Sequence, residues 1–187
     1  MDSHMRREIA EIPQAAARLL DAADPVLPEI GRRLAASPPR FLTTVARGSS
    51  DHAASYLKYA TELVAGIPVA SIGPSVASIY GARLRLDESA AICISQSGKS
   101  PDIVAMAETT RAGGAFIIAI TNTPASPLAE AADAAIDIKA GPERSVAATK
   151  TFVNSALAGL AILAHAVQDR ALLEALNDLP RHLEQAV

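Results

Sequence analysis

The feature that most constrains the fold of this chain is the repeated alternation of short apolar runs with helical segments. Runs rich in β-branched and small apolar residues lie at residues 41–46, 66–72, 89–95, 115–121 and 133–139. Strands that are apolar throughout are buried on both faces, which is typical of a parallel sheet covered by helices. The pattern therefore predicts an α/β fold with a five-stranded parallel sheet.

The segments between these runs have the 3.6-residue apolar spacing of helices. We expect helices at residues 51–65, 75–80, 101–112, 126–132, 146–167 and 170–184. Connections between parallel strands are right-handed, so these helices should cover both faces of the sheet. The predicted architecture is a three-layer, flavodoxin-like sandwich.

The first forty residues have a different pattern from the rest of the chain. Helical spacing covers residues 6–20 and 27–36, and prolines follow. We predict an N-terminal helical arm over residues 1–39, which packs beside the sheet without joining it. The main domain is expected over residues 40–168, and a C-terminal helix or linker over residues 169–187.

Charge and composition exclude several function classes. The net charge of −3 argues against non-specific nucleic-acid binding, which needs a basic face. The strongly apolar stretch at residues 157–167 is shorter than the roughly 20 residues of a membrane span, so no membrane partner is expected. The single cysteine, Cys93, allows no internal disulfide and no cysteine-based zinc site, which fits a reducing, cytoplasmic compartment. No signal peptide, metal or cofactor is expected.

Polar turns follow the predicted strands at the edge where ligands bind in such sheets. The turn at residues 95–102 reads Ser-Gln-Ser-Gly-Lys-Ser-Pro-Asp, and it opens a helix. The first N–H groups of a helix lack internal acceptors and attract anions, while Gly98 lets the backbone approach closely. The turn therefore predicts a phosphate cradle. The alternative is that Ser100 only caps the helix.

The turn after the first strand has the same composition. Residues 47–52 read Arg-Gly-Ser-Ser-Asp-His, again with a glycine and hydroxyls before a helix. Two such turns at the ends of adjacent strands favour an anion site over simple capping. His52 is interpreted as structural or solvent-exposed rather than catalytic.

A third segment, residues 141–151, lies between the last strand and a long helix. Glu143 and Lys150 are its candidates for acid–base chemistry. The alternative for both is a surface ion pair or a helix-end charge, which would contribute little to stability.

These three segments together resemble the SIS (sugar isomerase) domain family. Residues 95–98, 47–50 and 146–150 resemble the first SIS half of the isomerase module of glucosamine-6-phosphate synthase. Residues 47–51, 74–78 and 140–146 are closer to the SIS-type glucosamine-6-phosphate deaminase. The opening at residues 7–13 is similar to the start of the synthase module, so the resemblance covers nearly the whole chain.

The resemblance implies a role for each matching residue. The substrate phosphate would be held by Ser50, Ser95, Gln96, Ser97 and Ser100. The sugar would lie near Gly48, Ser49, Val146 and Lys150, with Val146 approaching through its backbone. Glu143, the candidate catalytic residue, would stand near the sugar or brace the loop.

The chain departs from the synthase pattern at three positions. Ser100 replaces threonine, Lys99 replaces glutamate and Ala148 replaces serine. The last change removes a possible contact to a sugar hydroxyl. No glutaminase domain precedes the module in this sequence, so glutamine-dependent synthesis is not expected.

The expected function is that of the first SIS half of an aldose–ketose isomerase or deaminase acting on a hexosamine 6-phosphate. Its expected partners are the phosphosugar and either a second SIS half or further copies of the chain, since family enzymes take most catalytic residues from the second half. One alternative is a non-catalytic sugar-phosphate sensor. Another is a one-domain isomerase, active as an oligomer, with Glu143 or His52 as its base.

Overall fold

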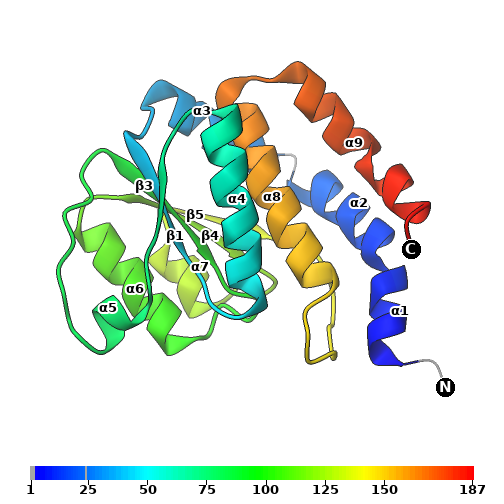
Figure 1. The fold of residues 1–187 in the computed structure, drawn as a ribbon, viewed down its shortest axis with the longest axis horizontal. Helices are drawn as coiled ribbons and strands as arrows, with labels where there is room; N and C mark the ends of the chain where they lie inside the picture. Colours follow the sequence, from blue (N-terminus) through cyan, green and yellow to red (C-terminus); the bar gives the residue numbers. More distant parts are fainter. Residues whose placement is uncertain (1–2, 24) are drawn as a thin grey trace.

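The computed structural model describes residues 3–23 and 25–187 as a five-stranded sheet between two layers of helices (Figure 1). The strands are β1 (Phe41–Val45), β2 (Val69–Ser71), β3 (Ser89–Ile94), β4 (Phe116–Thr121) and β5 (Ala134–Asp137). Every pair is parallel, in the order β2-β1-β3-β4-β5. The predicted fold class is confirmed.

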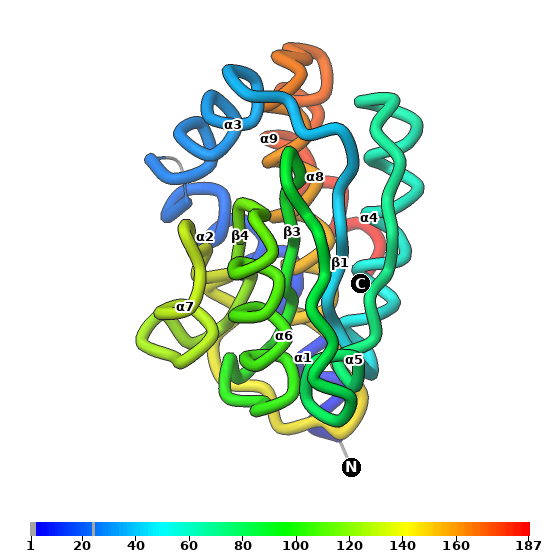
Figure 2. Tube along the Cα trace, turned by 90° about the vertical axis from the view of Figure 1, so that its left-hand side faces the viewer, coloured from blue at the N-terminus to red at the C-terminus, as the bar shows by residue number. Residues whose placement is uncertain are grey.

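Helices cover both faces of this sheet. One layer is formed by α2 (Ile12–Ala23), α3 (Leu27–Ala36), α4 (Ser49–Val64), α8 (Lys150–Val167) and α9 (Arg170–Glu184). The other is formed by α5 (Ser75–Ser78), α6 (Pro101–Ala112) and α7 (Pro127–Ala131). Figure 2, turned by 90°, shows α6 and α7 in front of the sheet and α8 behind it.

The central strands divide their side chains between two apolar cores. In β3, Ile92 and Ile94 pack with the α8 layer, whereas Ala91 and Cys93 pack with the α6 layer. Successive side chains of a strand point to opposite faces, so a strand that is covered on both faces is apolar at most of its positions. Burial raises the pKa of the Cys93 thiol to about 12, as expected for a small hydrophobe in the core.

The order of strands reverses beside β1. The chain leaves β1 for the edge strand β2 and then returns to β3 on the other side of β1. Val45 is in register with Cys93, so β1 and β3 end at the same edge of the sheet. Ligands of open α/β sheets bind at such a reversal, which places the turns after β1 and β3 side by side.

The predicted helix over residues 6–20 is wrong in its extent, because the structure has two helices there. The first, α1 (His4–Ala10), is followed by the C-cap residue Glu11, and α2 starts at Ile12. Pro13 has no N–H to donate to the preceding turn, which explains the break. Both α2 and α3 contribute side chains to the core around α8, and Leu19 and Ile30 are almost fully buried there.

The last long helix also differs from its predicted extent. It begins at Lys150 rather than at residue 146, and the preceding residues form an irregular loop. By length and composition α8 could cross a membrane, but 61% of it is buried within the described fold, as in the core helix of a globular domain.

Candidate functional site

The turn between β3 and α6 is a tight backbone loop built around Gly98. The Gly98 N–H donates to the Ser95 carbonyl at 3.1 Å, and the Leu128 N–H donates to the Gly98 carbonyl at 3.0 Å. Gly98 has a φ of +61°, and a Cβ there would collide with Ser126 and Thr121. Glycine satisfies both requirements: it adopts the positive φ readily, and it lets the chain pass close to Ser126 at the start of α7.

Arg47 joins this turn to the turn after β1. Its Nη2 donates to Ser100 Oγ at 3.2 Å, and its Nη1 lies 3.5 Å from Asp102 Oδ2. Ser100 occupies the N-cap position of α6, but its side chain makes no capping hydrogen bond. The geometry therefore does not support the interpretation of Ser100 as a simple cap.

A hollow of about 170 Å³ lies between these two turns. It is lined by Arg47, Ser50, Ile94, Ser95, Gln96, Ser97, Ser100 and Ile103. The structure thus brings together all five residues predicted to bind phosphate. It adds a guanidinium beside the first N–H groups of α6, and both favour an anion.

A second hollow of about 210 Å³ adjoins the first, and the two share Ser50 and Gln96. Its lining residues are Ser49, Ser50, Gln96, Glu143, Ser145, Val146, Ala148, Thr151 and Phe152. It therefore contains the predicted sugar-side residues Ser49 and Val146, together with Glu143. We refer to the two as the phosphate-side hollow and the sugar-side hollow.

Two predicted sugar-side residues lie outside both linings. Gly48, with a φ of +58°, starts α4 and provides a conformation that other residues rarely adopt. Lys150 is only 2% exposed, and its Nζ pairs with Glu11 at the junction of α1 and α2. The structure therefore does not bring Lys150 into either hollow, because its ammonium is directed to Glu11 of the N-terminal helices.

Glu143 caps α8 from within the preceding loop. Its Oε1 accepts from Thr149 N–H at 3.0 Å, from Thr149 Oγ1 at 2.7 Å and from Thr151 N–H at 3.1 Å, and its Oε2 accepts from Thr151 Oγ1. A carboxylate at a helix N-terminus satisfies N–H groups that lack internal acceptors. These contacts explain why α8 begins at Lys150. Of the two roles expected for Glu143, they fit the one in which it braces the loop.

A second carboxylate holds the same loop from the N-terminal arm. Glu8 is buried, and it accepts hydrogen bonds from the N–H of Arg144, the N–H of Ser145 and the Ser145 hydroxyl. The Ser145 hydroxyl is the main cause of a pKa of Glu8 below its usual value, followed by the Arg144 N–H, with a contribution from the charge of Lys150; burial opposes these effects. The ionised form of Glu8 is therefore favoured in the folded chain.

Several of these residues were not predicted from the sequence. Arg47 could have been found, because it is a cation immediately before the glycine of a hydroxyl-rich turn. Ser145, from the loop, and Thr151 and Phe152, from the first turn of α8, also line the sugar-side hollow. His52 is exposed on α4 and lies outside both linings.

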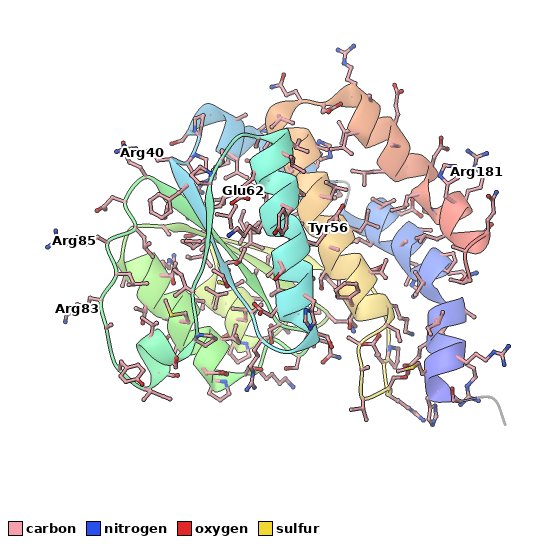
Figure 3. The ribbon with its side chains drawn as sticks, viewed as in Figure 1. Arg40, Tyr56, Glu62, Arg83, Arg85 and Arg181 are labelled. Carbon is pink, nitrogen blue, oxygen red and sulfur yellow. The ribbon has the colours of Figure 1, made fainter. Side chains whose placement is uncertain are left out.

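Other surface features are less suited to an anionic ligand. A larger hollow of about 510 Å³ between α6 and α7 has Glu108 and Glu130 in its lining, and its Arg111 is already paired with Asp133. Arg83 and Arg85 point outward from the connection between α5 and β3 (Figure 3), and neither lines the two adjoining hollows.

Comparison with known proteins gives consistent relatives. The family model described as "SIS domain" matches residues 39–165. The chain is 35% identical over 155 residues to a glutamine–fructose-6-phosphate aminotransferase (isomerizing) from Halobacterium salinarum, covering 78% of this chain and 26% of the relative. It is 33% identical over 193 residues to the enzyme of that name from Zymomonas mobilis, covering 97% of this chain and 31% of the relative.

A solved structure assigned as a phosphosugar isomerase, from Silicibacter pomeroyi DSS-3, superimposes with a TM-score of 0.96 at 55% identity. The match covers 98% of this chain and 56% of that one. The chain therefore spans about half of this solved relative and about a quarter to a third of the two aminotransferases.

Proposed function

This chain belongs to the SIS domain family, and from that premise we propose that it binds a hexosamine 6-phosphate as the first SIS half of an isomerase or deaminase. The observation that carries the proposal is the convergence of Ser50, Ser95, Gln96, Ser97 and Ser100 on one small hollow beside Arg47. This hollow lies at the reversal of strand order, where open α/β sheets bind ligands.

The phosphate-side hollow suits a dianion held by many donors. Hydroxyls, an amide and helix N–H groups can surround three phosphate oxygens, and Arg47 adds positive charge that Asp102 only partly offsets. We propose that the phosphate binds here and that its binding energy orients the sugar. The sugar carbons would then lie in the sugar-side hollow, which shares two lining residues with the first.

The proposed chemistry is ring opening followed by proton transfer between C1 and C2. Hydrolytic deamination of glucosamine 6-phosphate would consume one water, which supplies the C2 carbonyl oxygen, release ammonia and leave fructose 6-phosphate. In this proposal the chain holds the phosphate and shapes one wall of the sugar site. The proton-transferring groups come from a second SIS half or from further copies of the chain.

Glu143 is the candidate base if this chain is active without a second half. Both of its oxygens accept hydrogen bonds from Thr149 and Thr151. Because these hydrogen bonds already engage both carboxylate oxygens, they favour a second candidate function, a sugar-phosphate sensor that binds without catalysis. An unchanged isomerisation rate in Glu143→Gln would remove Glu143 as the base, and abolition of the reaction with unchanged binding of the phosphosugar would favour the one-domain enzyme.

Calorimetric titration with glucosamine 6-phosphate, free glucosamine and inorganic phosphate tests the proposal. We expect the phosphosugar to bind most tightly. Ser97→Ala should weaken its binding about 10- to 100-fold, because one hydrogen bond to a charged oxygen is lost. Ser55→Ala, at an exposed position of α4, is the matched control and should bind normally.

Absence of binding by the folded wild-type chain at millimolar ligand would contradict a phosphosugar site formed by this chain alone. Where binding is found, an ammonia-release assay tests whether copies of this chain suffice for catalysis. Release of ammonia supports a deaminase formed by this chain alone, whereas binding without release is expected both for the sensor and for a first half whose proton-transferring groups lie in a second SIS half.

A further inference from the structure

The loop at residues 141–149, which follows β5, lies directly beside helix α1. Figure 1 shows this yellow segment below α8 and next to the blue helix, and Figure 2 shows the same neighbourhood from the side. The loop has no regular secondary structure, so its conformation depends on contacts from other elements. Three side chains of the N-terminal arm supply such contacts.

Glu8 makes the most direct contact with the loop. Its carboxylate accepts from the Arg144 N–H at 2.5 Å and from the Ser145 N–H at 3.1 Å, and the Ser145 hydroxyl also donates to it. Two successive backbone amides are thereby fixed by one side chain. Val146, whose side chain is fully exposed and which lines the sugar-side hollow, is the next residue along the chain.

Glu11 and Arg18 hold the two ends of the same segment. Glu11 pairs with the buried ammonium of Lys150, at the start of α8. Arg18 donates from Nε to the Lys139 carbonyl at 3.2 Å and from Nη2 to the Ala140 carbonyl at 3.4 Å. The arm therefore fixes the beginning, the middle and the end of this segment.

The phosphate-side hollow is built without the arm. Its lining comes from the ends of β1 and β3 and from the turns and helix starts that follow them. Among the described residues, the hydrogen bonds of Glu8 join it to Arg144 and Ser145 and to no residue of that lining. The two halves of the site thus depend on different parts of the chain.

We propose that Glu8 is a positioning residue that shapes the sugar-side wall of the site, acting through the backbone of Arg144 and Ser145. Its effect on ligand binding rests on the proposed function; its effect on the loop does not. Glu8 contributes to recognition of the sugar and leaves recognition of the phosphate unchanged. The substitution Glu8→Ala should therefore separate the two affinities.

The first test needs no ligand. Arg144 is a trypsin site within the held segment, so the rate of cleavage after Arg144 reports on opening of the loop. Glu8→Ala should raise this rate about tenfold, because two amides and a hydroxyl lose a charged acceptor. Glu29→Ala is the matched control, since Glu29 is an exposed arm carboxylate that pairs with Arg32 on its own helix. It should leave the cleavage rate unchanged.

The second test compares two ligands by calorimetry. Glu8→Ala should weaken glucosamine 6-phosphate about tenfold and change the affinity for inorganic phosphate less than twofold. Glu8→Gln keeps one acceptor oxygen and should lie between wild type and Glu8→Ala. It also carries the test if Glu8→Ala does not fold.

Each outcome decides the proposal. Unchanged cleavage after Arg144 would overturn it, as would equal weakening of both ligands or faster cleavage at every site, since these indicate general destabilisation. If the wild-type chain binds neither ligand, the proposed function fails, and the cleavage rates alone decide whether Glu8 positions the loop.

Discussion

The two adjoining hollows of this chain are built in opposite ways. The phosphate-side hollow is formed by two short turns, and each of its polar residues lies within about six residues of the end of the preceding strand. The sugar-side hollow has one wall made of an irregular loop, and that loop is held by Glu8, which is 136 residues from Arg144 in the sequence. A site can thus join a rigid, locally determined half to a half that depends on distant contacts.

This difference separates two properties of the proposed site. Phosphate binding should depend on backbone geometry at the sheet edge, which is difficult to alter without destabilising the core. Sugar recognition should depend on a few side-chain contacts of the loop, which can change without loss of the fold. Variants that affect one half only are the direct way to examine this division.

The largest effect is expected for Gly98→Ala. The new Cβ would adopt an unfavourable φ of +61° and collide with Ser126 and Thr121. We expect the free energy of unfolding to fall by about 3–4 kcal/mol, from backbone strain and overpacking together. Urea denaturation measures the change.

Gly66→Ala is the matched control, because it measures the cost of a positive φ without a steric clash. Gly66 has a φ of +66°, but a Cβ added there would have no atom within 4 Å. The Gly66→Ala substitution should lower the free energy of unfolding by only about 1–2 kcal/mol. Equal losses in the two variants would contradict the close approach of Gly98 to α7.

A smaller effect is expected where the arm meets α8. Glu11→Ala leaves the buried Lys150 ammonium without its partner, and we expect a loss of about 2–3 kcal/mol in the free energy of unfolding. Lys150→Met removes the buried charge and leaves Glu11, which is 53% exposed, in contact with water. The Lys150→Met substitution should lower the free energy of unfolding by less than about 1 kcal/mol.

The order of these two losses is the informative result. Thermal and urea denaturation of both variants should show Glu11→Ala as the less stable. The reverse order would mean that the Lys150 ammonium is stabilised by groups other than Glu11, and that the arm contributes less to this end of the loop.

The smallest effect concerns pH. The hydrogen bonds of Glu8 hold its pKa below the usual value of about 4.3, so the stabilising contribution of this carboxylate is complete above that value. It is lost as the pH falls through the lower pKa of the folded chain, where protonation removes acceptors for Arg144 and Ser145. Lys150 is the charged group that adds to this shift.

Hydrogen exchange of the Arg144 and Ser145 amides, corrected for the intrinsic rate, should therefore rise in the wild type as the pH falls through the lowered pKa of Glu8. Glu8→Gln should show fast exchange of both amides at neutral pH and little further change in acid. Identical pH profiles in the two proteins would contradict the role of the ionised carboxylate.

The sheet and the phosphate-side lining could be predicted because their signals are local. The strand Ser89–Ile94 is buried at every position, and all of its residues after Ser89 are apolar. Ser95 and Ser97 follow directly after that strand, so predicting the strand end also predicts where they lie. The reversal of strand order then indicates which turns meet.

The loop could not be predicted in this way. The start of α8 is set by the side chain of Glu143, and the direction of Lys150 is set by Glu11, which lies 139 residues earlier. The apolar spacing of the sequence carries no information about such long-range contacts. The break at Glu11 was open to prediction, because Pro13 cannot donate to the preceding turn, whereas the apolar spacing of residues 6–20 continues across it.

The contact between α1 and the loop also has a consequence for synthesis of the chain. Glu8 leaves the ribosome well before Arg144, because Arg144 lies 136 residues later and synthesis at roughly 5–20 residues per second needs about 7–27 seconds for that length. The turns after β1 and β3 can assemble during that interval, as soon as the central strands are made. The phosphate-side half is therefore expected to be complete while Glu8 still awaits its partners, which makes closure of the sugar-side wall one of the last steps in folding of the nascent protein.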